Sequence, residues 1–262
     1  MSLTRNFLGS IAAASAFIFT PLAQAAENHV HGGDIVVDVQ AGKLTITSGE
    51  AQAGTGYKIF EGAFTTLTNF NRWTTDDPGF DMEPGTLTQG DQLWVRGLGG
   101  LKSWNSATST WVASVPGNEL IQLQDALNGS WVFRPSAIIE IPGFNQTGAG
   151  AIAESNASGQ IHKHLDFHLL NSAANNAQMG TPVADGAYLI QLQLFSPTTA
   201  PGGGLKYFDS DPFFIAFNRG MDDVAFESAV EVLAVPEPSA ALMLLPALGI
   251  IAWRIRRQSL KS

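Results

Sequence analysis

The five histidines of this chain lie in two short segments, residues 29–31 and 161–168. Alternate residues of a β-strand point to the same side. If the second segment is one strand, a single face carries His162, His164, Asp166 and His168. The opposite face is mostly apolar and suits a protein core. Because imidazole and carboxylate groups are the usual nitrogen and oxygen ligands of transition metals, the pattern predicts a metal site.

The strand geometry limits which of these residues share an ion. Residues 162 and 168 would be about 20 Å apart on a straight strand. We therefore expect His162 and His164 to form the central pair, with Asp166 on the same face and His168 beyond reach of the same ion. His29, His31 or a distant carboxylate would complete the ligand set. The alternative is that exposed histidines simply decorate a strand.

The expected ion is zinc, which takes nitrogen and oxygen ligands, while copper(II) accepts a similar set in a flatter array. The chain has no cysteine, so thiolate ligands are excluded. A second candidate lies in residues 76–83, where four carboxylates occur within eight residues. Calcium prefers such oxygen-rich loops, but the spacing differs from that of an EF-hand, and an acidic surface turn is the alternative.

The elements that must position these residues are mostly β-strands. Short β-branched runs are separated by turn-forming residues, with 27 glycines and 13 prolines in the chain. The expected strands are 34–39, 43–47, 57–60, 92–95, 110–113, 131–133, 138–141, 162–170, 188–194 and 212–217. Helix signals are few: residues 118–127, and residues 222–233, which could also form a last strand. Residues 143–159 are expected to form a loop. The sequence thus predicts a mainly β fold, a single β-sandwich or jelly-roll-like domain with few short helices.

Both ends of the chain have the character of processing signals. Arg5, an apolar stretch and the segment Ala23–Gln24–Ala25 are typical of a secretory signal peptide over residues 1–25. At the other end, residues 240–253 form an apolar run that arginines follow. We therefore predict a domain over residues 26–234, followed by a hydrophobic sorting helix and basic tail over residues 235–262 that contacts the membrane before processing.

The C-terminal segment resembles the PEP-CTERM sorting signal of Gram-negative bacteria. Pro236–Glu237–Pro238 matches its defining motif, and the apolar segment and basic tail follow in the same order. The resemblance implies processing by an exosortase-type membrane protease and location at the cell surface or in the extracellular matrix. Residues 186–194 and 210–218, with the histidine segments, are also similar to PEP-CTERM proteins regulated by the zinc-uptake repressor. That resemblance implies zinc scavenging or storage at the surface.

Charge narrows the functional classes. The chain has 14 Lys+Arg and 23 Asp+Glu; five bases and one acid lie in residues 1–25 and 236–262, which leaves 9 bases, 22 acids and a net charge of −13. Such an acidic domain is unsuited to binding nucleic acid, whose phosphates need a basic surface, and is compatible with cation binding. We expect a non-enzymatic metal-binding protein. The alternatives are a structural or adhesive matrix protein whose tryptophans bind polysaccharide, and a metal-dependent hydrolase with Asp166 or Glu154 as base.

Overall fold

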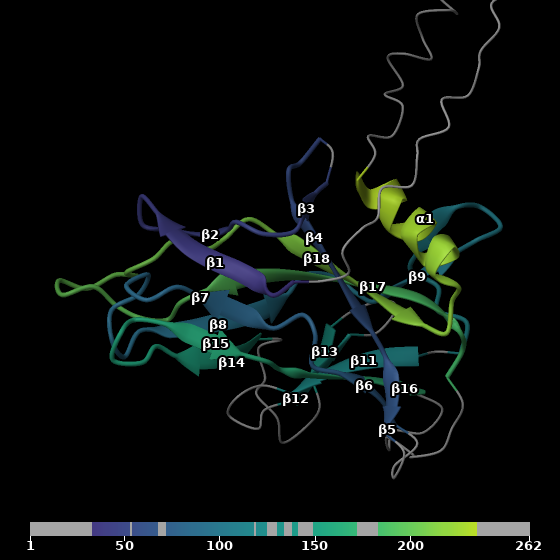
Figure 1. Ribbon diagram of the computed structural model, residues 1–262. Coiled ribbons are helices and arrows are strands. Elements are labelled where there is room, and N and C mark those ends of the chain that lie inside the picture. The colour runs from purple at the N-terminus through teal and green to yellow at the C-terminus, as the bar shows by residue number, and fades with distance from the viewer. Residues whose placement is uncertain are drawn as a thin grey trace, which may run out of the picture. The chain divides into compact units, whose positions relative to one another are not determined.

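The computed structural model describes residues 33–234, except for seven short gaps (Figure 1). The gaps are residue 53 and residues 68–71, 118, 125–129, 134–137, 141–148 and 172–182. The described residues form a mainly β fold with three sheets and one helix, which confirms the predicted fold class. The predicted signal peptide and sorting helix lie outside these residues.

A four-stranded sheet carries the candidate site. Its strand order is β15-β7-β1-β2. The strands are β1 (Ile35–Gln40), β2 (Lys43–Ile46), β7 (Phe80–Met82) and β15 (Ile161–Lys163). β1 and β2 form the expected hairpin, whose turn places Ala41 and Gly42 at positive φ. β1 pairs in parallel with β7, and β7 pairs antiparallel with β15, so strands far apart in sequence become neighbours.

An eight-stranded sheet lies beside it in the fold (Figure 1). Its main order is β10-β9-β17-β18-β4-β3, while β8 pairs with both β17 and β14. The strands are β3 (Glu50–Ala51), β4 (Lys58–Ala63), β8 (Gln92–Gly97), β9 (Lys102–Asn105), β10 (Thr110–Val112), β14 (Ala149–Glu154), β17 (Gly186–Phe195) and β18 (Phe213–Arg219).

A six-stranded sheet has the order β13-β12-β11-β16-β6-β5. Its strands are β5 (Thr65–Leu67), β6 (Arg72–Thr75), β11 (Glu119–Gln124), β12 (Ser130–Phe133), β13 (Ile138–Glu140) and β16 (Asp166–Asn171). One apolar cluster contains residues of all three sheets, including Ile35 of β1, Ile215 of β18 and Phe167 of β16. This shared core gives the fold its sandwich-like character.

Helix α1 (Asp223–Ala234) covers part of the other face of the eight-stranded sheet. Its buried Phe226 and Val230 belong to a second apolar cluster with Leu189 of β17. The Trp111 indole Nε1–H donates to the Ala229 carbonyl at 3.0 Å and joins β10 to the helix. Residues 222–233 therefore form a helix rather than a last strand. Within the described part of the chain, no helix is long and apolar enough to cross a membrane.

Three element predictions were wrong. The expected helix over residues 118–127 contains strand β11, whose alternating apolar and polar residues fit a strand between two partners. The expected loop over residues 143–159 contains β14, where small side chains allow close pairing with β8. The expected strand over residues 162–170 is divided into β15 and β16, which belong to different sheets.

The buried carboxylate of Asp91 holds together residues from two segments between the strands of the eight-stranded sheet. Asp91 Oδ2 accepts hydrogen bonds from Lys206 Nζ at 2.7 Å, from the Tyr207 hydroxyl at 2.5 Å and from the Thr88 amide at 2.9 Å. Burial alone would raise the pKa of Asp91, but these hydrogen bonds outweigh it and hold the pKa below its ordinary value. The ionised carboxylate is therefore the form that the fold stabilises.

Candidate metal centre

The predicted alternation of buried and exposed side chains over residues 161–169 is present although the segment is divided into two strands. Ile161, Leu165, Phe167 and Leu169 are all buried. The chain leaves the four-stranded sheet after Lys163 and enters the six-stranded sheet at Asp166. His164 therefore lies in the connection between two sheets, next to the buried Leu165. His162 is the central residue of β15, an edge strand of its sheet.

Asp34 is brought to these histidines by the pairing of β1 with β7. The Ile35 amide donates to the Gly79 carbonyl at 2.8 Å, and the Gly79 amide donates to Asp34 Oδ1 at 3.1 Å. On the other side of β7, His162 is paired directly with Asp81. The sheet thus places Asp34, the residue before β1, beside a strand that lies far along the chain.

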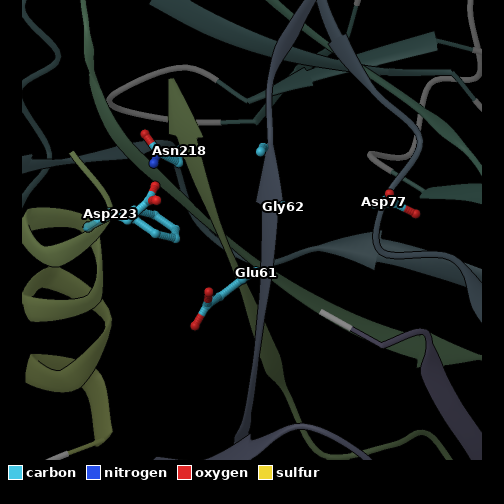
Figure 2. A pocket seen from close by; sticks show the side chains of 7 residues that line it. Glu61, Gly62, Asp77, Asn218 and Asp223 are labelled. Atoms are coloured by element: carbon cyan, nitrogen blue, oxygen red, sulfur yellow. The ribbon is translucent and has the colours of Figure 1, made fainter. Parts of the chain in front are cut away.

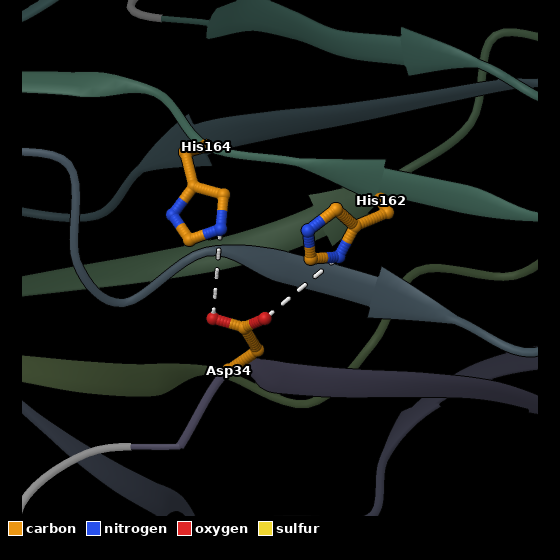
Figure 3. Close-up of side chains that lie close together, drawn as sticks. All are labelled: Asp34, His162 and His164. Atoms are coloured by element: carbon orange, nitrogen blue, oxygen red, sulfur yellow. Dashed lines mark ion pairs between the residues drawn. The ribbon is translucent and has the colours of Figure 1, made fainter.

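Three side chains converge at this point (Figure 3). One ligand atom from each of Asp34, His162 and His164 lies within 4.8 Å of the others. His162 Nδ1 is 3.8 Å from Asp34 Oδ2, and His164 Nε2 is 4.0 Å from Asp34 Oδ1. Zinc bonds of about 2.0–2.1 Å in tetrahedral geometry separate neighbouring ligand atoms by about 3.3 Å. Ligand atoms as far as 4.8 Å apart must therefore approach each other by up to about 1.5 Å before the three groups share one ion.

A backbone carbonyl orients His164. The His164 Nδ1 and Asp76 carbonyl oxygen are 2.9 Å apart. A carbonyl can only accept, so Nδ1 carries the hydrogen in this pair. In the neutral ring the lone pair is then on Nε2, the atom that faces Asp34. Metal-binding histidines are commonly held in this way, with the second ring nitrogen bonded to a carbonyl or carboxylate.

Gly79 allows the ligands to approach the sheet. A Cβ atom at this position would lie 2.6 Å from His164 Cε1 and 2.8 Å from Asp34 Oδ1. Real Cβ atoms essentially never come this close to other atoms. The absence of a side chain at position 79 is therefore a condition for the observed positions of His164 and Asp34.

The acidic segment over residues 76–83 adjoins the histidines, although the sequence suggested two separate constellations. Asp77 Oδ1 lies 3.6 Å from His164 Nδ1, and Asp81 Oδ1 lies 3.5 Å from His162 Nδ1. Together with Asp34, three carboxylates surround two imidazoles. This concentration of negative charge favours a bound cation.

The remaining predicted residues are placed differently. Asp166 and His168 are on β16, where they pair with Gln124 and Gln122 of β11. Neither belongs to the cluster of His and Asp ligand atoms that the described residues form. His29 and His31 lie outside the described residues. Asp34 was missed as a ligand because nothing in its local sequence shows that β1 will lie near the histidine strand.

A pocket of about 290 Å³ lies between β4 and α1 (Figure 2). It is lined by Glu61, Gly62, Ala63, Asp77, Asn218, Asp223 and Phe226. The Asn218 side-chain amide is used in hydrogen bonds with the backbone of Met221. The lining contains three acids and no histidine.

The sequence comparison concerns the C-terminal segment. Residues 234–258 match the PEP-CTERM protein-sorting motif. The chain is therefore an exported protein that is anchored transiently in the membrane through its C-terminus, processed by an exosortase and then located at the surface. This confirms the predicted sorting signal and localisation. No curated protein matches the chain.

Proposed function

We propose that this surface-sorted protein binds zinc through Asp34, His162 and His164, for scavenging or storage outside the cell. The observation that carries the proposal is the convergence of these three side chains from separate segments of the chain. The oriented Nε2 of His164 supports it, because this atom faces the Asp34 carboxylate at 4.0 Å. The acidic surroundings add attraction for a divalent cation.

The donor types favour zinc over the other ions considered. Calcium takes six to eight oxygen ligands, and two imidazoles do not suit it. Copper(II) prefers a flatter array of ligands. Two imidazoles and a carboxylate that approach one point from separate segments of the chain fit a tetrahedral ion better. Competition between zinc and copper for the protein decides between these two ions.

The N-terminal histidines are proposed as one candidate source of a further ligand, and a nearby carboxylate is the other. His31 precedes Asp34 by three residues, so their Cα atoms can be at most about 11 Å apart. His29 and His31 are thus close enough along the chain to reach an ion at Asp34. Asp166 and His168 are not assigned to this ion, because their strand belongs to the six-stranded sheet.

Metal titration of the purified, tag-free protein tests the proposal. We expect one zinc ion per chain in competition with a chromophoric chelator. The double substitution His162→Ala and His164→Ala should abolish this binding, while His168→Gln serves as a matched control on the next strand. Binding that persists unchanged in the double variant would refute the proposed site.

A matrix or adhesive role is the second candidate, and one surface supports it. On the outer face of β8 and β17, the rings of Trp94 and Phe195 are 6.0 Å apart and Arg96 stacks on Phe195. All three side chains are partly exposed. Flat aromatic faces with polar neighbours suit a polysaccharide partner. Retention of the protein on extracellular polysaccharide that is lost in Trp94→Ala, with no zinc binding, would favour this role.

A further inference from the structure

We infer that Asp81 is the fourth ligand of the proposed metal centre and closes it. The inference rests on the proposed function, since it concerns the same ion. Asp81 occupies the middle of β7, directly opposite His162 on β15. Its position is fixed by the strand pairing on both sides, to Val36 of β1 and to His162.

Asp81 joins the centre through His162. It is not among the three residues whose ligand atoms all lie within 4.8 Å of one another, so its carboxylate must move toward the others to share their ion. Asp81 Oδ1 is 3.5 Å from His162 Nδ1, closer than Asp34 Oδ2 at 3.8 Å. Both values approach the separation of about 3.3 Å that tetrahedral zinc imposes on neighbouring ligands. An ion on His162 Nδ1 therefore has two carboxylates nearby, Asp34 from the residue before β1 and Asp81 from β7.

Asp77 does not have this role, although it has the same charge and lies at a similar distance from a histidine. It approaches Nδ1 of His164, the nitrogen that is bonded to the Asp76 carbonyl. The metal-facing atom of His164 is Nε2. Asp77 thus contributes negative charge near the centre, whereas Asp81 contributes a ligand atom.

This assignment has a chemical consequence. Two imidazoles and two carboxylates fill a tetrahedral zinc ion and neutralise its charge. Catalytic zinc sites keep one position for water or substrate, whereas structural sites do not. A closed centre of two histidines and two aspartates holds its ion, which agrees with storage or scavenging and not with hydrolysis.

The test compares Asp81→Asn with Asp77→Asn in the full chain. Each substitution removes one negative charge from the same neighbourhood, so their difference isolates the ligand role. We expect zinc affinity to fall about tenfold to a hundredfold in Asp81→Asn and by less than about threefold in Asp77→Asn. Cobalt(II) in place of zinc should show the visible absorption of a tetrahedral ion in the wild type and a changed spectrum in Asp81→Asn.

The outcomes separate this inference from the proposed function. Equal affinities and identical cobalt spectra for the wild type and Asp81→Asn would overturn the role of Asp81 and leave the three-ligand site intact. Equal losses in both variants would also overturn it, because charge alone would then explain the effect. Absence of zinc binding by the wild type would refute the proposed function itself.

Discussion

Replacing Gly79 by alanine should weaken metal binding without changing any ligand. The new Cβ would lie 2.6 Å from His164 Cε1 and 2.8 Å from Asp34 Oδ1, whereas ordinary contacts begin at 3.4 Å. The histidine ring and the carboxylate must therefore retreat by about 0.6–0.8 Å. That displacement moves two of the three ligand side chains away from positions in which their ligand atoms lie within 4.8 Å of one another.

The expected loss of zinc affinity depends on which atoms move to make room for the new Cβ. The atoms that the Cβ meets are at the far ends of two side chains, so the fold can absorb the change at the site. Gly79 does not have a positive φ, and its backbone therefore accepts alanine. Disturbing groups that orient metal ligands typically costs about 10- to 100-fold in affinity, or about 1.4–2.8 kcal/mol.

The assay is competitive zinc titration of wild type, Gly79→Ala and Gly33→Ala. Gly33 is the matched control, because it adjoins Asp34 and an added Cβ there meets nothing within 4 Å. Thermal unfolding without metal should show that Gly79→Ala is folded. The reasoning is refuted if Gly79→Ala binds zinc within about twofold of wild type, or if Gly33→Ala loses as much affinity as Gly79→Ala.

Three further predictions concern ligand linkage, pH and the helix. Zinc at 100 times its Kd should stabilise the protein by about 2.7 kcal/mol and raise Tm by about 5–10 °C. A chelator should reverse the shift, and a Tm that does not change with zinc would contradict the prediction. Asp91→Asn should destabilise the fold by about 1–3 kcal/mol at neutral pH, measured by denaturant unfolding. The pKa of Asp91 is lower in the folded protein than its ordinary 3.8. The difference in unfolding free energy between wild type and Asp91→Asn should therefore be complete above pH 3.8 and shrink as pH falls through the folded-state pKa. A difference that stays unchanged at low pH would contradict this. Trp111→Phe removes the hydrogen bond to Ala229 and should cost about 1 kcal/mol, with faster proteolysis near α1; equal stability and proteolysis would show that this bond is dispensable.

The sequence predicted two of the three converging side chains of the candidate site. The spacing of His162 and His164 was enough to identify them as a pair, because a two-residue interval keeps side chains on one side of an extended segment. Asp34 could not be found in this way. It reaches the histidines through a parallel pairing of β1 with β7 and an antiparallel pairing of β7 with β15, and such long-range partners leave no trace in local spacing.

The fold class was easier to predict than the division of its strands. Alternation along Ile161–Leu169 correctly indicated which residues are buried, but the same alternation continues through the connection at His164. Burial alone therefore could not reveal that the chain changes sheets. In β11, a polar start followed by a mixed apolar run is also typical of a helix. The segment forms a strand because it pairs with β12 on one side and with β16 on the other.

Helix α1 ends at Ala234, the residue at which the sorting motif begins. Only one residue separates Ala234 from Pro236, so a membrane enzyme that reads the motif must come within about 7 Å of the last helical residue. The helix is held against the sheet by Val230 and by the Trp111 bond. The sorting motif therefore begins at the end of a helix whose packing against the sheet fixes the position of the motif's first residue.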